Sequence, residues 1–219
     1  VSSHYGISLT LNINKSLFIW STSVTTNDFN IDGYCDPAFR SVEKVFFQNF
    51  KIRSEIGASV CVYQGQNKVV DLWGGHLDET KSQPWKANTI TLMNSVAKSI
   101  CALAVHILVD KGWVNLDAPV SDYWPEFSQH GKEKILVRHV QGHQCGAVFS
   151  DSAQPGDWFN YSKQCAAIAR QKPAWPPETK GGYNTINIGF ILGEIVRHIT
   201  GKTIGTFIRD EISQPLGCL

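Results

Sequence analysis

Residues 94–112 have the sequence NSVAKSICALAVHILVDKG. Ser95 and Lys98 are three positions apart, so on a helix they share one face, where the lysine amine reaches the serine hydroxyl. The following residues are apolar on nearly every side, which predicts a helix from Ser95 to about Lys111-Gly112 inside a protein. A lysine held against that interior loses hydration, which favours its neutral form. Lys98 is therefore a candidate base for Ser95.

The spacing alone does not identify a catalytic pair. Ser95 could simply cap the helix while Lys98 extends to water. The S-x-x-K spacing also occurs at Ser41–Lys44, beside Arg40 and Glu43. That second pair lies opposite the phenylalanines of an amphipathic helix, so we expect it to be solvated.

Local signals predict the elements that precede this segment. Asp36-Pro37 is a helix-start signal, and the phenylalanines that follow at helical spacing extend the helix to about Lys51. Residues 58–63 and 68–73 are β-rich runs around Gln64-Gly65-Gln66-Asn67, which predicts a hairpin. Residues 1–30 show no sustained periodicity and are left unassigned.

The second half of the chain is predicted to be helical. Short helices are expected near residues 137–142 and 158–171. Residues 173–177, PAWPP, force an extended connection. Two further helices are expected at about 186–199 and 204–212, with a hinge at Gly201.

Composition excludes several classes of function. The chain has 219 residues, of which 42% are hydrophobic, enough to bury a core. Its 20 basic and 19 acidic side chains leave a formal net charge of +1, so nucleic acid is not an expected partner. The longest apolar stretch, Ile100–Val109, is too short to cross a bilayer.

The six cysteines form no C-x-x-C pair, so the sequence predicts no zinc site and favours a reducing compartment such as the cytoplasm. Two N-x-S sequons, at Asn14 and Asn160, do not change that interpretation. No cofactor is implied.

Several landmarks occur together, in order, along the chain. They are DLWGG at 71–75, NSVAKS at 94–99, LDAPV at 116–120, YWPEF at 123–127, VRHV at 137–140 with His143, and GFILGE at 189–194 with Thr200-Gly201. In these motifs the chain resembles the serine β-lactamase-related family, which includes class C β-lactamases and penicillin-binding-protein-like esterases. The resemblance extends from about Gly33 to the last residue.

The resemblance implies an α/β fold of the α+β type, β-lactamase/transpeptidase-like, with a helical subdomain and an antiparallel sheet. It also implies acyl transfer from a small ester or amide: Ser95 attacks the carbonyl, Lys98 accepts the proton and Tyr183 of Tyr183-Asn184-Thr185 relays it. Asn184 and Thr185 are then expected to bind substrate. Many β-lactamases have asparagine where Thr185 stands, which favours a carboxylesterase.

Other possible site motifs are interpreted as structural. Ser121-Asp122-Tyr123 imitates S-D-N but ends in tyrosine, and Lys202-Thr203-Ile204-Gly205 resembles K-T-G but lies between helices. His139 and His143 correspond to histidines that support a loop in the family, and no metal site is predicted.

In the family the chain continues beyond the position of Leu219 into further strands and a third motif. We therefore expect residues 31–219 to be the N-terminal part of a β-lactamase-related domain, truncated at its C-terminus, with an incomplete sheet. The 58–73 hairpin would lack partners, and its exposed edge could support self-association. The alternatives are a catalytically inactive binding module, a β-lactamase and a D-amino-acid peptidase.

Overall fold

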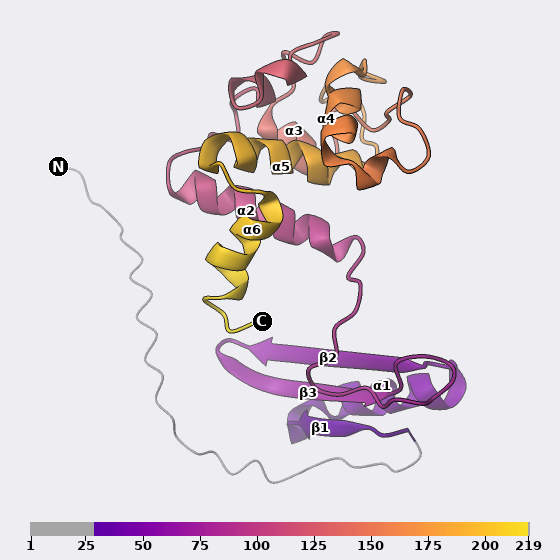
Figure 1. Ribbon diagram of the computed structural model, residues 1–219. Coiled ribbons are helices and arrows are strands. Elements are labelled where there is room, and N and C mark those ends of the chain that lie inside the picture. Colours follow the sequence, from indigo (N-terminus) through magenta and orange to yellow (C-terminus); the bar gives the residue numbers. More distant parts are fainter. Residues whose placement is uncertain (1–28, 219) are drawn as a thin grey trace, which may run out of the picture. The chain divides into compact units, whose positions relative to one another are not determined.

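The computed structural model describes residues 29–218, which fall into two compact units, the first ending at Thr91 and the second starting at Leu92. The unassigned residues 1–28 lie outside the described part. Figure 1 gives the element labels used below. Among the described helices, none has both the length and the apolar character needed to span a membrane.

The first unit is a three-stranded antiparallel sheet with one helix. Its elements are β1 (Asp32–Cys35), α1 (Arg40–Ile52), β2 (Gly57–Gln64) and β3 (Asn67–Gly75), and the strand order is β1-β3-β2. The predicted hairpin is confirmed as β2 and β3, joined at Gly65, whose φ is +61°. Only glycine adopts that backbone conformation without steric cost.

Strand β1 was not predicted, and it corrects the expectation that the hairpin lacks partners. β3 is the central strand, because β1 pairs with its second edge, with Tyr34 opposite Asp71. The four residues of β1 include a glycine at φ +123°, so they carry no alternating pattern that a sequence analysis could detect.

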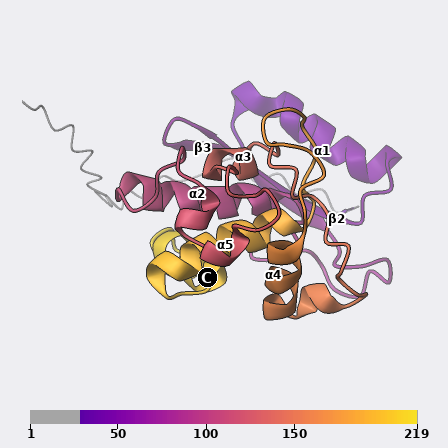
Figure 2. The ribbon, with the colours of Figure 1, turned by 90° about the horizontal axis from the view of Figure 1, so that it is seen from above.

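Helix α1 covers one face of this sheet, as Figures 1 and 2 show. It begins as predicted: the Asp36 carboxylate accepts a hydrogen bond from the Ala38 N–H at 2.8 Å, and a short 3-10 turn with Pro37 leads into the helix. Phe46 and Phe50 of α1 pack with Val70 and Leu72 of β3 in the core of this unit.

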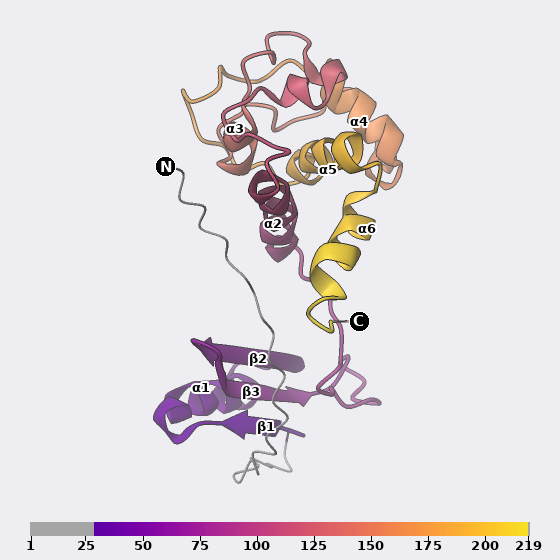
Figure 3. The ribbon, with the colours of Figure 1, turned by 90° about the vertical axis from the view of Figure 1, so that its left-hand side faces the viewer.

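The second unit is helical and is built around α2 (Val96–Asp110) and α5 (Asn187–Thr200). These two helices pack together, with α6 (Ile204–Ile208) against both, as seen in Figures 1 and 3. Helix α4 (Tyr161–Arg170) packs on α5 (Figure 2), and the short α3 (Val137–Gln141) also contacts α5. A π-helical turn, Arg209–Ser213, follows α6.

The start of one helix and the burial of another differ from the predictions. Helix α4 begins at Tyr161 rather than at residue 158, because the Asn160 side chain accepts from the Lys163 N–H and so caps the helix there. Helix α2 is buried on one side only. Leu108 is fully covered, whereas Val96 and Leu103 keep 59% and 44% of their surface exposed.

The turn after α5 is as expected. Gly201 has φ +71° and ends α5, and the Thr203 hydroxyl accepts from the Thr206 N–H at the start of α6. Lys202-Thr203-Ile204-Gly205 is therefore a turn and a helix cap.

Candidate functional site

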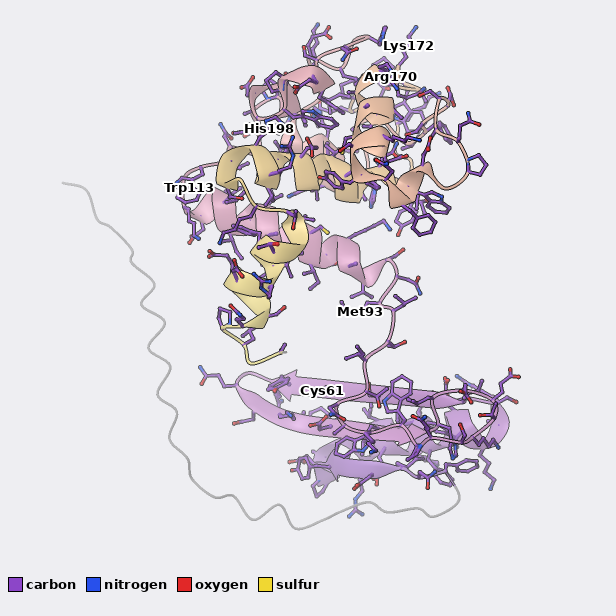
Figure 4. The ribbon with its side chains drawn as sticks, viewed as in Figure 1. Cys61, Met93, Trp113, Arg170, Lys172 and His198 are labelled. Atoms are coloured by element: carbon purple, nitrogen blue, oxygen red, sulfur yellow. The ribbon has the colours of Figure 1, made fainter. Side chains whose placement is uncertain are left out.

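Ser95 and Lys98 form a hydrogen-bonded pair at the start of α2. The Lys98 Nζ lies 3.2 Å from the Ser95 Oγ. Ser95 is exposed and its side chain makes no capping hydrogen bond to the helix, so the interpretation of Ser95 as a simple cap does not hold. Met93, labelled in Figure 4, lies in the segment that leads into this turn. The serine hydroxyl is thus open to solvent and hydrogen-bonded to an amine.

Lys98 is less enclosed than the sequence indicated. Its side chain is half-buried, because it lies in the first turn of α2, before the residues that the core covers. The second S-x-x-K pair differs from the first: Ser41 and Lys44 are both exposed on α1.

Tyr183 joins the pair from the loop between α4 and α5. The Lys98 Nζ lies 5.0 Å from the centroid of the Tyr183 ring. The pKa of the Tyr183 phenol is lowered, first by hydrogen bonding with Ser95, then by hydrogen bonding with Lys98 and by the positive charge of that amine. The second unit therefore brings together three side chains that lie up to 88 positions apart in the sequence.

His143 holds the loop that carries Tyr183. Its ring lies 4.8 Å from the Tyr183 ring, centroid to centroid. Its Nδ1 accepts from the Asn184 N–H at 3.0 Å, and its backbone carbonyl accepts from the Gly182 N–H at 2.9 Å. The pKa of His143 is lowered by burial and by the charge of Lys98. A neutral ring with Nδ1 as acceptor fits both facts.

The geometry of Asn184 does not fit the expected contact with substrate. Its side chain is fully buried. The amide oxygen accepts from the Ile188 N–H at 2.9 Å, and the amide nitrogen donates to the Ala147 carbonyl at 3.2 Å. Asn184 thus satisfies a backbone donor at the start of α5 and fastens the loop. An asparagine just before a helix is a capping signal, and it could have indicated this role.

Thr185, by contrast, is exposed and lines an open groove of about 300 Å³ in the second unit. Lys98 lines the same groove, which is therefore called the Lys98 groove below. Its walls are mostly apolar and include Trp158 and Phe159. The sequence did not indicate a role for these two aromatic residues, because the 3-10 turn that carries them, Asp157–Phe159, contains no motif.

A second group of charged side chains fastens the same loop at Glu178. The Glu178 carboxylate lies 2.8 Å from the His139 Nε2 and accepts from Arg138 at 2.7 Å. Arg138 also bonds to Asp117. Hydrogen bonding with Arg138, and next with His139, lowers the pKa of Glu178. His139 is buried, and these contacts are consistent with support of a loop.

A cavity of about 370 Å³ between α4 and α5 offers no comparable nucleophile. Burial raises the pKa of its Cys165 thiol to about 12. Its Glu194 carboxylate is buried and held by Arg197 at 2.6 Å.

Comparisons with known proteins identify relatives of this chain. The chain is 31% identical to "Esterase/beta-lactamase LipL" of Mycobacterium tuberculosis over 184 residues, which are 84% of this chain and 43% of that protein. It is 26% identical to "Esterase EstB" of Burkholderia gladioli over 195 residues, which are 80% of this chain and 49% of that protein. The chain thus spans about half the length of the curated relatives it matches.

Solved structures confirm the expected β-lactamase/transpeptidase-like fold. A penicillin-binding protein homolog from Caulobacter crescentus superposes with a TM-score of 0.81 at 38% identity, over 85% of this chain and 51% of that one. A family VIII carboxylesterase has the same TM-score at 36% identity, over 85% and 52%. The family model described as Beta-lactamase matches residues 42–218. The chain therefore belongs to the beta-lactamase family.

Proposed function

We propose that this chain carries the nucleophile and base of a serine hydrolase that acts on small esters or amides through an acyl-enzyme, with carboxylesterase activity. Ser95 is the nucleophile, Lys98 the general base and Tyr183 the proton relay. One observation carries the proposal: the Lys98 Nζ is hydrogen-bonded to the Ser95 Oγ at 3.2 Å, and the Tyr183 ring lies 5.0 Å from the same Nζ.

The chemistry follows from this arrangement. In the structure the Lys98 Nζ donates to the Ser95 Oγ. Action as a general base requires the Nζ lone pair, which then accepts from the Ser95 O–H. As the Oγ forms its bond to the carbonyl carbon, the serine proton passes to Lys98. When the bond between the carbonyl carbon and the leaving group breaks, the leaving group takes a proton from the Tyr183 phenol. Lys98 then returns a proton to Tyr183. Water attacks the acyl-enzyme by the same proton route, releases the carboxylic acid and returns the proton to Ser95.

The remaining candidate residues have different roles in this proposal. Thr185 faces the Lys98 groove and contacts substrate. Asn184 does not contact substrate but positions the Tyr183 loop through its buried amide.

The names of relatives support an ester as substrate, although the name of LipL also includes "beta-lactamase". "Esterase" stands in the names of LipL and EstB, and a family VIII carboxylesterase is 36% identical. The inactive binding module gains no support, since these relatives are named as hydrolases. The β-lactamase and D-amino-acid peptidase alternatives predict a different substrate order: a β-lactam or a D-amino-acid amide would be turned over faster than a simple ester.

A fluorophosphonate probe tests the proposal directly. The Ser95 Oγ attacks phosphorus, the P–F bond breaks, fluoride leaves and the serine proton passes to Lys98. Intact-protein mass spectrometry with peptide mapping is expected to find one adduct, on Ser95. Ser95→Ala abolishes the adduct, while the matched variant Ser41→Ala keeps it. Equal labelling of the parent and both variants, or no adduct on folded protein, would overturn the proposal.

A further inference from the structure

The Lys98 groove adjoins the proposed nucleophile. Asn94 and Lys98, on either side of Ser95 in the sequence, both line it. Lys98, whose Nζ is hydrogen-bonded to the Ser95 Oγ, is thus itself a residue of the groove wall. A substituent on a carbonyl carbon held at Ser95 lies within reach of the groove.

The groove walls are apolar and open to solvent. Phe159 keeps 90% of its surface exposed, Trp158 keeps 53% and Ile186 keeps 37%. The Trp158 and Phe159 rings lie 5.9 Å apart, centroid to centroid. An apolar ligand that covers these side chains removes their surface from water, which favours binding.

Gly189 of α5 leaves space in the groove wall. A Cβ added at Gly189 would have nothing within 4 Å outside its own helix. The missing side chain thus contributes directly to the depth of the groove. A larger residue at this position would project into open space rather than into the core, so the fold tolerates the change.

We propose that the Lys98 groove is the acyl subsite, that it binds an aliphatic or arylalkyl acyl chain of about six to eight carbons, and that Gly189 sets its size. The volume of about 300 Å³ is roughly twice that of the ~150 Å³ cavity that holds benzene in a model protein. This inference rests on the proposed function, since it assigns the acyl side of the Ser95 reaction.

The test compares fluorophosphonates that differ in one substituent. In the first series the P-alkyl group, which stands for the acyl chain, runs from methyl to octyl with a constant methoxy group. In the second series the P-alkyl group stays methyl and the alkoxy group lengthens. In the first series the rate constant for Ser95 labelling is expected to rise by about threefold per added methylene until the groove is full. The second series shows a weaker dependence.

Two glycine variants connect this selectivity to the groove. Gly189→Leu is expected to reduce the octyl-to-methyl rate ratio by at least tenfold, with a smaller reduction for Gly189→Ala. Gly205→Leu is the matched control: Gly205 is also helical and has open space around it, but it lies in α6, outside the groove. Its ratio stays at the parent value. Far-UV circular dichroism confirms that each variant is folded.

The outcomes separate this inference from the proposed function. No labelling of Ser95 by any probe overturns the proposed function. Labelling at rates independent of P-alkyl length overturns the acyl subsite while the proposed function stands. Dependence on the alkoxy chain alone, or an unchanged ratio in folded Gly189→Leu, likewise overturns the assignment of this groove to the acyl chain.

Discussion

Replacement of Asn184 by alanine distinguishes a structural role from a substrate contact. The variant removes the acceptor of the Ile188 N–H and a donor to the Ala147 carbonyl, both in a fully buried setting. The Ala147 carbonyl still accepts from Asn187 at 3.2 Å, so the Ile188 N–H is the group left without a partner. The structure therefore predicts a loss of stability at the start of α5.

The magnitude follows from the two lost hydrogen bonds. A buried donor left unsatisfied costs about 1–3 kcal/mol, and the net loss of a second hydrogen bond adds about 1 kcal/mol. We expect the free energy of unfolding of the second unit to fall by about 2–4 kcal/mol, or roughly 30- to 900-fold in the folding equilibrium.

Urea denaturation followed by far-UV circular dichroism measures this loss, because most of the helical residues belong to the second unit. Thr185→Ala is the matched control, because Thr185 is next to Asn184 in the sequence but has an exposed side chain. The stability of this variant stays within about 0.5 kcal/mol of the parent. If Asn184→Ala were as stable as the parent and instead bound substrate more weakly, the structural role argued for Asn184 would be wrong.

Four further predictions follow from individual contacts. Lys98→Ala is expected to slow labelling of Ser95 near neutral pH by about 10²-fold or more, and an unchanged rate would show that another group takes the proton. His143→Phe keeps a ring beside Tyr183 but removes the Nδ1 acceptor of the Asn184 N–H, so labelling slows by about tenfold. The pKa of His143 is lowered, so the parent keeps this hydrogen bond down to a pH below the ordinary histidine value of 6.5. A pH profile of Ser95 labelling checks this, and a rate that already falls near pH 6.5 would contradict it. Lys132→Met removes the buried ammonium that donates to the Gln129, Ala169 and Gln171 carbonyls, which costs about 2–4 kcal/mol in urea denaturation, whereas exposed Lys134→Met has little effect. The pKa of Glu178 is lowered in the folded chain, so its stabilisation is present above the unfolded value of 4.5 and is lost as the pH falls through the lower folded value; the stability difference between the parent and Glu178→Gln should shrink in acid titrations, and a constant difference would contradict this.

Much of the candidate site could be predicted from the sequence because its signals are local. Ser95 and Lys98 are three residues apart, and helix geometry alone places them together. Tyr183 was predicted only from the family resemblance, because the sequence around it does not distinguish it from other loop tyrosines. The burial of Asn184 could not be predicted, because it depends on the Ala147 carbonyl and on where α5 begins.

By itself, the sequence determined the parts of this protein that depend on neighbouring residues. The Asp36 cap, the turn at Gly65 and the shared helix face of Ser95 and Lys98 arise from backbone geometry and short-range hydrogen bonds. Each of these features depends on residues that lie only a few positions apart, so a short stretch of sequence is enough to predict it.

Only the tertiary structure decided which distant residues meet. Strand β1 pairs with β3, His143 contacts Tyr183, and Trp158 and Gly189 line one groove with Lys98. Such contacts join segments tens of residues apart, and their free energy depends on burial and packing in the folded state, which no local pattern contains.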